Sequence, residues 1–415
     1  MLNNKLDVSN KEIGSAITDA AENEVILSAD LEVVLLKVIE DHDFKNYTVN
    51  KKSMMIRGEG FMGRLYEIKV KEVAGEEKLE MNFFVKCIYP GVDVVLFPVR
   101  GVFMREIFVY EELSKVYESL QTDAGVPLED RYDFVKCFGV CKNEGSEALI
   151  LENMTAKGYK TYNKNDSISL EFARLCMIRL AKFHALSYAL ETLRPEYFRT
   201  KVEPLATQYQ FDDNWTRYVW NTAQATLDVF EPTDPRHQKI RDFVDKTIQK
   251  FPVYFARADR SVLCHGDYRP SNVLMKEKDG GLSGVMPVDY QIVQMCTPII
   301  DLVYFFFAGT DRAFRNAHMN DLKKLYRETM CTFLKRFDID LEEVSPTAEF
   351  EQDYKDKLDY GLMIGLVFLP YILVPAELAP DLSSAPVTEI RIRGGSLFQQ
   401  RITEIVDDFE LWGYL

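Results

Sequence analysis

The spacing of the hydrophobic positions changes along the chain and divides it into two regions. From Lys51 to about residue 151, apolar and polar residues alternate over short runs, a pattern typical of half-buried strands. The runs predicted to form strands are 65–70, 79–87, 134–140 and 148–151. Beyond residue 152 the apolar residues recur at helical spacing, most clearly over 169–190. This pattern predicts an α+β fold of two lobes, with a β-rich N-lobe and a mainly helical C-lobe.

Helical spacing also occurs twice before residue 152. Residues 1–48 are predicted to be an N-terminal extension ending in one amphipathic helix, which Ser28 or Asp30 would cap. Its apolar positions are Leu31, Val34, Leu35, Val38 and Ile39. A second helix is predicted over 102–116, inside the N-lobe. The predicted domains are therefore the extension at 1–48, the N-lobe at 49–152 and the C-lobe at 153–415.

Composition and charge narrow the class of protein. The 415 residues are 47% hydrophobic and 12% aromatic, which is ample for a large buried core. The net charge of −15 argues against a nucleic-acid or membrane-surface partner, because both need clustered Lys and Arg. The longest apolar run, Gly361 to Pro375, contains Pro370 and is too short to span a bilayer. We expect a globular protein with neither nucleic acid nor membrane as a partner.

The cysteines and the first residues favour a cytoplasmic location. Seven cysteines are spread along the chain, an odd number that is typical of reduced thiols. The residues after Met1 lack the apolar segment of a secretory signal. Cys137 and Cys141 fall within a predicted strand, and no second Cys or His pair follows at zinc-site spacing, so they are expected in the core.

Candidate chemistry gathers in two short stretches of the C-lobe. Residues 262–272 read Val-Leu-Cys-His-Gly-Asp-Tyr-Arg-Pro-Ser-Asn, and residues 288–291 read Val-Asp-Tyr-Gln. They supply two carboxylates, Asp267 and Asp289, and the amide of Asn272. This set is what phosphoryl transfer requires: Asp267 would deprotonate an attacking hydroxyl, while Asn272 and Asp289 would hold Mg²⁺ on a triphosphate. An asparagine five residues after the aspartate is also the spacing of the kinase catalytic loop.

The alternative for Asp267 alone is a solvated surface loop, because most aspartates are exposed. The flanking apolar runs favour the catalytic interpretation, since they predict short buried strands that would aim polar residues at a turn. These runs are 262–263, 273–275 and 285–288. Asp301 lies in another apolar run and is expected to be buried and paired with backbone amides of the 265–272 loop.

Two histidines are expected to be structural rather than catalytic. His184 lies in the apolar stripe of the predicted helix over 169–190, where a polar side chain is usually hydrogen-bonded. His265 precedes Asp267 and is expected to brace the loop by hydrogen bonds. No G-x-S-x-G occurs, which argues against a serine hydrolase.

The N-lobe supplies candidates for binding ATP. Gly58, Gly60 and Gly63 form a G-x-G-x-x-G that precedes a strand rather than a helix. This context disfavours a Rossmann fingerprint and favours a loop that folds over phosphates. Lys86 ends a predicted strand and is placed to reach the α- and β-phosphates. Taken by itself, Lys86 would more often be an exposed edge-strand lysine.

The remaining nucleotide-site candidates flank the N-lobe strands. Glu106, in the helix over 102–116, is the candidate partner that would fix Lys86 and keep it charged, with Glu111 and Glu112 as competitors. The composition shifts near 152–158, which predicts a hinge between the lobes. Backbone groups of Glu152 and Met154 are predicted to meet the adenine edge there.

On these residues the chain resembles the ecdysteroid-kinase-like (CHK-type) family, relatives of choline kinases and aminoglycoside phosphotransferases. The resemblance runs from about Met55 to Phe307 and more loosely to the end. Its most specific parts are Leu149-Ile150-Leu151-Glu152-Asn153-Met154 with Gly158-Tyr159, Leu180-Ala181-Lys182-Phe183-His184-Ala185, His265-Gly266-Asp267 with Asn272, and Val288-Asp289-Tyr290-Gln291 with Asp301-Leu302. Many members carry a Leu-Trp pair after His-Gly-Asp, whereas this chain has Tyr268-Arg269-Pro270-Ser271, as in aminoglycoside phosphotransferases.

The resemblance implies a protein-kinase-like fold for the two lobes. It implies Asp267 as the catalytic base, Asn272 and Asp289 as Mg²⁺ ligands, and Lys86 as the phosphate lysine. The implied activity transfers the γ-phosphoryl group of ATP to a hydroxyl group of a small molecule. A protein kinase is disfavoured because no Ala-Pro-Glu follows Asp289. A pseudokinase that only binds ligands is disfavoured because the site is complete.

The leading substrate class is an ecdysteroid or another apolar alcohol. It follows from the resemblance and from aromatic residues that either line a pocket or pack in the core: Trp215, Tyr218, Trp220 and Phe305–Phe307. A choline-type substrate would need an aromatic and acidic cage, and an aminoglycoside would need clustered acids.

Overall fold

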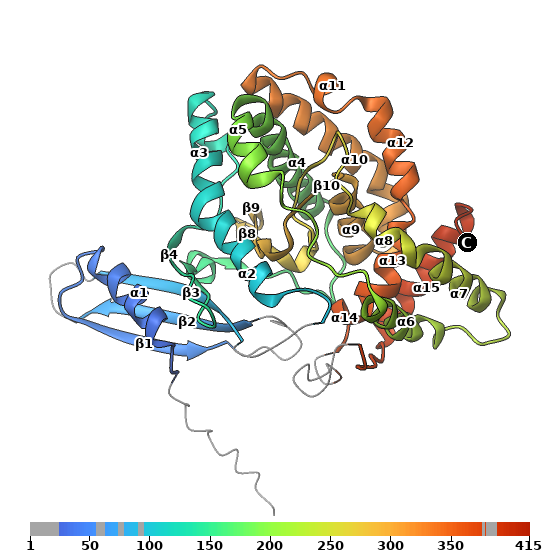
Figure 1. The fold of residues 1–415 in the computed structure, drawn as a ribbon, viewed down its shortest axis with the longest axis horizontal. Coiled ribbons are helices and arrows are strands. Elements are labelled where there is room, and N and C mark those ends of the chain that lie inside the picture. Colours follow the sequence, from blue (N-terminus) through green and yellow to red (C-terminus); the bar gives the residue numbers. More distant parts are fainter. Residues whose placement is uncertain (1–24, 55–62, 74–78, 90–94, 376–377, 379–387) are drawn as a thin grey trace, which may run out of the picture.

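Figure 1 shows the chain folded into two lobes, a sheet with one covering helix and a larger helical body. The computed structural model describes residues 25–54, 63–73, 79–89, 95–375, 378 and 388–415. The prediction of a bilobal α+β fold, with a β-rich N-lobe and a mainly helical C-lobe, is confirmed. Among the described residues, no helix combines the length and hydropathy needed to cross a membrane.

The N-lobe is built on one antiparallel sheet of five strands. Their order is β1-β2-β3-β5-β4. The strands are β1 Tyr47–Ser53, β2 Gly63–Glu72, β3 Glu80–Ile88, β4 Cys137–Cys141 and β5 Ala148–Glu152. Side chains alternate between buried and exposed along β2, as the period of two predicts. Pairing with β2 and β5 makes β3 the central strand, so Lys86 lies inside the sheet rather than at an edge.

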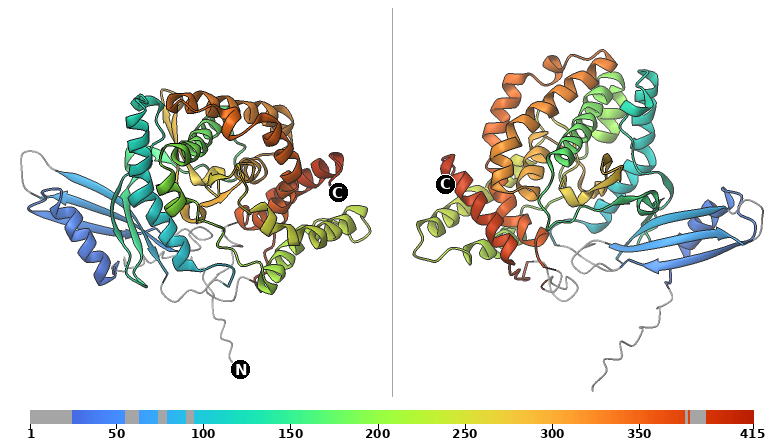
Figure 2. Two further views of the ribbon diagram at one scale, coloured as in Figure 1. Left: turned by 45° about the horizontal axis from the view of Figure 1, so that its top comes forward. Right: turned by 180° about the vertical axis from the view of Figure 1, so that it is seen from behind.

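Helix α1 (Ala29–Glu40) packs on this sheet as part of the N-lobe. The Ser28 hydroxyl caps it by accepting a hydrogen bond from the Leu31 amide at 3.3 Å. Gly139 in β4 allows the close approach, since a Cβ there would lie 2.9 Å from a methyl group of Val34. The helix predicted near the N-terminus is therefore the outer layer of the sheet (Figures 1 and 2).

A long helix connects the two lobes and is interrupted by a π turn. It consists of α2 (Val99–Phe108), η1 (Val109–Leu113) and α3 (Ser114–Asp123). The Arg105 guanidinium anchors α2 to the C-lobe by donating to the carbonyls of Val293 at 2.7 Å and Ala206 at 2.5 Å. The sequence predicted this helix over 102–116 but neither the π turn nor the anchor.

The C-lobe packs around three helices: α4 (Leu170–Leu193), α9 (Ile299–Gly309) and α10 (Arg312–Leu334). Other helical elements are η3 Met154–Lys157, α5 Pro195–Tyr197, η4 Phe198–Val202, α6 Asp213–Leu227, α7 Pro235–Thr247, η5 Ile248–Lys250, α8 Phe251–Tyr254, η8 Lys335–Phe337, α11 Leu341–Val344, α12 Thr347–Lys357, α13 Tyr360–Met363, η9 Ile364–Phe368, α14 Leu369–Ile372 and α15 Ser396–Leu411. The long helix predicted over 169–190 is confirmed as α4, with Ser169 as its N-cap.

Short strands in the C-lobe carry the stretches predicted to hold the chemistry. β7 (Val262–Cys264) pairs with β10 (Gln294–Cys296). β8 (Val273–Lys278) pairs with β9 (Gly281–Pro287) and with β6 (Tyr159–Lys160). The buried strands predicted around Asp267 and Asp289 are therefore present, and β6 and β10 are additions that the sequence did not reveal.

Most of the aromatic residues considered for a substrate pocket belong to the core instead. Trp215, Phe305 and Phe306 are at most 1% exposed, and Tyr218 is also buried. Trp220 is half-buried beneath the Arg241 guanidinium. These aromatic residues therefore do not support an apolar substrate, because they pack helices against one another in the core. The seven cysteines are all free thiols, as predicted.

Two adjacent aspartates of α15 allow a test of what holds this helix to the C-lobe. Asp408 is buried and accepts from Arg315 of α10 at 2.7 and 2.9 Å, whereas the half-exposed Asp407 pairs with Arg236 and Arg312 at 3.1 and 3.3 Å. We expect Asp408→Asn to lower the free energy of unfolding by about 3 kcal/mol, because the buried guanidinium charge of Arg315 would lose its carboxylate partner. Asp407→Asn should cost less than about 1 kcal/mol. Urea unfolding of both variants measures this, and equal losses would contradict it.

Candidate active site

The 265–272 loop leaves β7 through a turn that requires glycine. Gly266 has a φ of +82°, and a Cβ there would lie 2.3 Å from the carbonyl oxygen of Ile292. A side chain at this position would therefore clash with backbone as well as strain the turn. The loop ends in a short 3₁₀ turn, Pro270–Asn272, that leads into β8. The glycine thus fixes where the next residue, Asp267, leaves the strand.

The buried carboxylate of Asp301 holds this loop from beneath. Its Oδ2 accepts from the His265 amide at 2.6 Å, and its Oδ1 accepts from the Gly266 amide at 2.9 Å. The predicted pairing of Asp301 with backbone amides of the loop is confirmed. Such charge-assisted bonds orient the loop, because both amides converge on one fully buried carboxylate.

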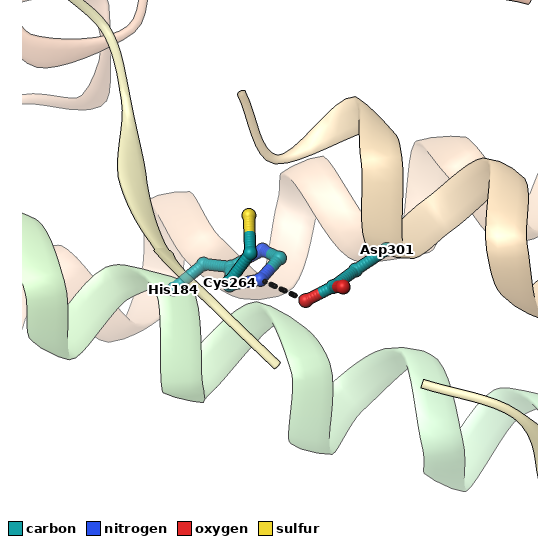
Figure 3. A group of neighbouring side chains, drawn as sticks. All are labelled: His184, Cys264 and Asp301. Atoms are coloured by element: carbon teal, nitrogen blue, oxygen red, sulfur yellow. Dashed lines mark hydrogen bonds and ion pairs between the residues drawn. The ribbon is translucent and has the colours of Figure 1, made fainter. Parts of the chain in front are cut away.

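His184 completes this brace from α4. Its Nε2 lies 3.0 Å from Asp301 Oδ2 (Figure 3). Its Nδ1 lies 2.8 Å from the Tyr326 hydroxyl. Its predicted structural role is confirmed by these two hydrogen bonds. His265 also braces the loop, since its Nε2 lies 3.0 Å from the Val288 carbonyl.

The group drawn in Figure 3 has the residue types of a metal site. The ligand atoms of His184, Cys264 and Asp301 lie within 4.8 Å of one another. Each is already engaged, because both histidine nitrogens and both carboxylate oxygens have protein partners and the Cys264 thiol donates to the Thr297 carbonyl at 3.2 Å. The group is therefore a structural network of hydrogen bonds.

Asp267 is held by two side chains of its own loop. The amide nitrogen of Asn272 donates to its Oδ2 at 2.8 Å and to its backbone carbonyl at 3.0 Å. The Arg269 Nε lies 3.2 Å from both carboxylate oxygens. Burial disfavours the charge of Arg269, but the neighbouring Asp267 more than offsets this and raises the pKa of the guanidinium above its ordinary value. The carboxylate is partly exposed, at 17% of the side chain.

Strand pairing brings Asp289 beside Asn272. Val273 of β8 lies opposite Pro287 of β9, and the Val288 amide donates to the Asn272 carbonyl at 2.9 Å. Asp289 then adopts a left-handed conformation, with a φ of +70°. A non-glycine residue in this region carries strain that the surrounding packing must sustain. The turn presents the Asp289 carboxylate to the N-lobe.

Lys86 bridges two carboxylates from different lobes. Its Nζ lies 2.8 Å from Glu106 Oε2 on α2 and 2.7 Å from Asp289 Oδ1. The other two candidate partners lie elsewhere: Glu111 pairs with Lys142 and Glu112 with Lys201. Of the three glutamates weighed from the sequence, Glu106 is therefore the one that contacts Lys86.

The pKa values of this trio follow from burial and mutual attraction. Burial opposes the charge of Lys86, but Asp289 and Glu106 more than offset this and raise its pKa. Burial raises the pKa of Glu106 to about 7, although Lys86 opposes the rise. Burial likewise opposes ionisation of Asp289, yet the attraction of Lys86 and then of Arg269 keeps its pKa below the ordinary value. Lys86 and Asp289 are thus charged at neutral pH, and the pKa of Glu106 is raised towards neutrality.

The remaining predicted positions lie around this centre. Gly58 and Gly60 fall outside the described residues, so the phosphate-loop interpretation stays a prediction. Gly63 begins β2, where a Cβ would lie 2.5 Å from the Cys87 carbonyl oxygen, so it permits close strand packing. Glu152 ends β5, and its amide donates to the Lys136 carbonyl. Met154 begins the 3₁₀ turn that follows.

The structure adds one residue that sequence reasoning did not select. Arg269 contacts Asp267, and the signal available was its position two residues after the aspartate, where the loop departs from the Leu-Trp pattern. The structure brings Lys86, Glu106 and Asp289 into contact, and it separately joins Asp267 to Asn272. The arrangement offers a carboxylate that can accept a proton, oxygen donors for a hard cation, and a fixed ammonium group.

Comparisons with known proteins show what this chain is similar to. The model described as "Ecdysteroid kinase-like family" matches residues 57–339. No curated protein matches the chain. Among solved structures, an ethanolamine kinase from Plasmodium vivax is 15% identical, with 75% of this chain and 80% of that one covered, at a TM-score of 0.35. An aminoglycoside 2'-phosphotransferase-IIIa in its GDP complex is 14% identical, covering 93% and 100%, at a TM-score of 0.37.

Asp301 can be tested as the support of the 265–272 loop. We expect Asp301→Asn to lower the free energy of unfolding by about 2–4 kcal/mol. One of the two buried backbone N–H groups would then face the NH₂ group of the asparagine side chain and would have no oxygen to donate to. Asp321→Asn, an exposed position on α10, is the matched control and should stay within about 0.5 kcal/mol. Urea unfolding of both variants gives the comparison. If the two losses were alike, Asp301 would not be the support.

Proposed function

The chain belongs to the ecdysteroid kinase-like family, and from this premise we propose that it transfers the γ-phosphoryl group of ATP to a hydroxyl group of a small molecule. The family makes the chain a small-molecule phosphotransferase. The observation that carries the detailed proposal is the trio in which Lys86 joins Glu106 of the N-lobe to Asp289 of the C-lobe. Phosphoryl transfer depends on such positioning and on charge stabilisation more than on covalent chemistry by the protein.

Asp267 is proposed as the base that accepts the proton of the attacking hydroxyl. Its carboxylate is partly exposed, and Asn272 and Arg269 hold it in one orientation. A positioned general base of this kind contributes about 10²- to 10⁴-fold in rate. The two donors leave carboxylate lone pairs for an acceptor hydroxyl, since each oxygen can accept more than one hydrogen bond.

Lys86 is proposed to bind the α- and β-phosphates of the nucleotide. The ammonium sits at the junction of the lobes and is already desolvated, so a phosphate oxygen would gain a strong charge-assisted hydrogen bond. Glu106 keeps the lysine in place on one side, and the backbone amide of Tyr290 in turn donates to Glu106. The backbone of Glu152 and Met154 is proposed to meet the adenine edge.

Asn272 and Asp289 fit a Mg²⁺ ion by their chemistry. Both offer hard oxygen ligands, and the Asn272 amide nitrogen faces Asp267, which leaves the amide oxygen for a cation. The Asp289 carboxylate is 32% exposed and has a lowered pKa, so it is ionised at neutral pH. When bound, Mg²⁺ would neutralise charge on the nucleotide phosphates.

An apolar alcohol such as an ecdysteroid is the proposed acceptor class. Membership of the family supports this acceptor class. The aromatic residues considered for a pocket do not support it, because they are packed in the helical core. A pseudokinase is disfavoured because each of Lys86, Asp267, Asn272 and Asp289 keeps a side chain able to act. Choline-type and aminoglycoside acceptors remain the comparison substrates.

ADP release from Mg-ATP tests the activity across an ecdysteroid, a simpler phenol, choline and an aminoglycoside. We expect release that depends on one alcohol, and we expect Asp267→Asn to lower kcat by about 10²- to 10⁴-fold because the base is lost. The control is Asp259→Asn, an exposed aspartate that precedes β7. Turnover that survives in Asp267→Asn would refute the assignment of the base.

The raised pKa of Glu106 predicts a pH dependence of nucleotide binding. Below about pH 7 its carboxyl is protonated, so the Lys86 ammonium is attracted mainly to Asp289. As the pH rises through about 7, ionised Glu106 draws Lys86 away from Asp289, and affinity for Mg-ADP should increase. Glu106→Gln should remove this step and keep the weaker affinity of low pH. Calorimetric titration between pH 6 and pH 8 measures both proteins.

The nucleotide itself also titrates in this pH range, and this affects both proteins equally. Comparing the unaltered chain with Glu106→Gln therefore corrects for it. A second control is Glu111→Gln, on the same long helix but paired with Lys142 at the surface. It should keep the dependence of the unaltered chain. A step near pH 7 that persists in Glu106→Gln would show that another group causes it.

A further inference from the structure

Three tyrosines of the C-lobe carry hydroxyl groups that the protein leaves without a partner. They are Tyr304 of α9, Tyr360 of α13 and Tyr209 in the segment that precedes α6. Among the described residues, none of these hydroxyls has a hydrogen-bond partner, yet none is enclosed in the way that the unpartnered hydroxyls of Tyr254 and Tyr354 are. Their donor and acceptor capacity is therefore available to a ligand.

Helix α9 holds Tyr304 against the 265–272 loop. In its first turn, Asp301 accepts from two amides of the loop at 2.6 and 2.9 Å. At its last residue, Gly309, a Cβ would lie 2.4 Å from the Pro270 ring. Tyr304 lies between these two contacts and three positions after Asp301, which places both side chains on one face of the helix. The helix therefore directs Tyr304 towards the loop that carries the proposed base.

The other two tyrosines are joined to each other by packing. The rings of Tyr209 and Tyr360 both contact Phe255, with centroid distances of 5.8 and 5.7 Å. Tyr209 also contacts Phe97, which precedes α2, at 5.8 Å. Three separate segments of the chain thus bring a phenol to this region, and aromatic contacts fix the direction of the rings.

The electrostatics place all three phenols in the surroundings of Asp267. Burial raises the pKa of Tyr304 well above its ordinary value, Asp267 adds to the rise, and Arg269 opposes it. Burial and then Asp267 raise the pKa of Tyr209. Burial raises the pKa of Tyr360 as well, with smaller contributions that include Tyr209 and Asp267. The phenols are therefore uncharged at neutral pH and close to the proposed base.

We propose that Tyr304 donates a hydrogen bond from its hydroxyl to an oxygen of the acceptor beside Asp267, with Tyr209 and Tyr360 as flanking contacts. The inference rests on the proposed kinase function and names residues that select its acceptor. An alcohol oxygen can accept from Tyr304 through a lone pair while its own proton faces Asp267, whose side chain is 17% exposed. Uncharged phenols on apolar rings fit a neutral apolar alcohol, since they offer neither a cation nor an anion a charged partner.

Tyr304→Phe tests the contact, because it removes only the hydroxyl and keeps the ring that packs on Phe368 at 5.8 Å. Equilibrium dialysis of the full chain with Mg-ADP present measures binding of three neutral alcohols: ecdysone, estradiol and benzyl alcohol. We expect at least one of them to bind. We expect Tyr304→Phe to weaken that alcohol by about threefold to tenfold, the net contribution of one neutral hydrogen bond.

Tyr354→Phe is the matched control. Tyr354 of α12 is a buried tyrosine of the same lobe, and its hydroxyl also lacks a partner but is enclosed. This variant should keep the affinity for the alcohol. Both variants should keep the affinity for Mg-ADP and the urea midpoint of the unaltered chain, which separates a contact with the acceptor from a structural role. In ADP-release assays, Tyr304→Phe should raise KM for the alcohol and leave KM for Mg-ATP unchanged.

Each outcome decides the proposal. Binding of none of the three alcohols would overturn it, as would equal affinity in Tyr304→Phe and the unaltered chain. A lower kcat with unchanged alcohol affinity would make Tyr304 a support of Asp267 and refute contact with the acceptor. Binding that depends on Tyr304 without ADP release would uphold the contact and refute the kinase. ADP release whose KM for the alcohol is unchanged in Tyr304→Phe would uphold the kinase and refute the contact.

Discussion

One ammonium group joins the two lobes, and the geometry between them depends on it. Lys86 on the central strand of the N-lobe sheet contacts Glu106 of α2 and Asp289 of the C-lobe. Lys86 and Glu106 have little access to water, whereas the Asp289 side chain is 32% exposed. Without a charged partner, the buried ammonium of Lys86 would carry a large desolvation penalty. Removing one partner therefore disturbs the other two. The relative position of the two lobes therefore depends on these ion pairs as well as on packing.

The surroundings reduce the freedom of this trio. Helix α2, which carries Glu106, is tied to the C-lobe by the hydrogen bonds of Arg105, and the 265–272 loop is tied to α9 by Asp301. The Tyr290 hydroxyl, next to Asp289, lies 2.5 Å from the Tyr132 hydroxyl within a cluster of aromatic rings. Rigid elements on each side thus hold the carboxylates in place before any ligand binds, which is the preorganisation that phosphoryl transfer uses.

Local patterns in the sequence predicted more of this structure than long-range contacts could. The strands around the loop follow from short apolar runs, and the partners of Asp301 follow from the need of a buried carboxylate for donors. The contacts of Arg105 lie 188 and 101 residues away, and no periodicity marks them. Arg269 could not be placed because its bond to Asp267 depends on the turn at Gly266. The sequence could not show whether the aromatic residues line a pocket or pack in the core, because both arrangements give the same spacing along a helix.

The pairing of cations with carboxylates explains how an acidic chain prepares sites for anions. Lys86, Arg269 and Arg401 each face a carboxylate, from Asp289, Asp267 and Asp311 respectively. Such pairs keep a desolvated cation charged when no ligand is present, since an isolated buried charge would be far more costly. Phosphate and carboxylate oxygens can then share or replace the protein carboxylate at a cation that is already fixed and dehydrated. Under this arrangement a net charge of −15 does not oppose binding of a nucleotide, because the local field at these cations decides it.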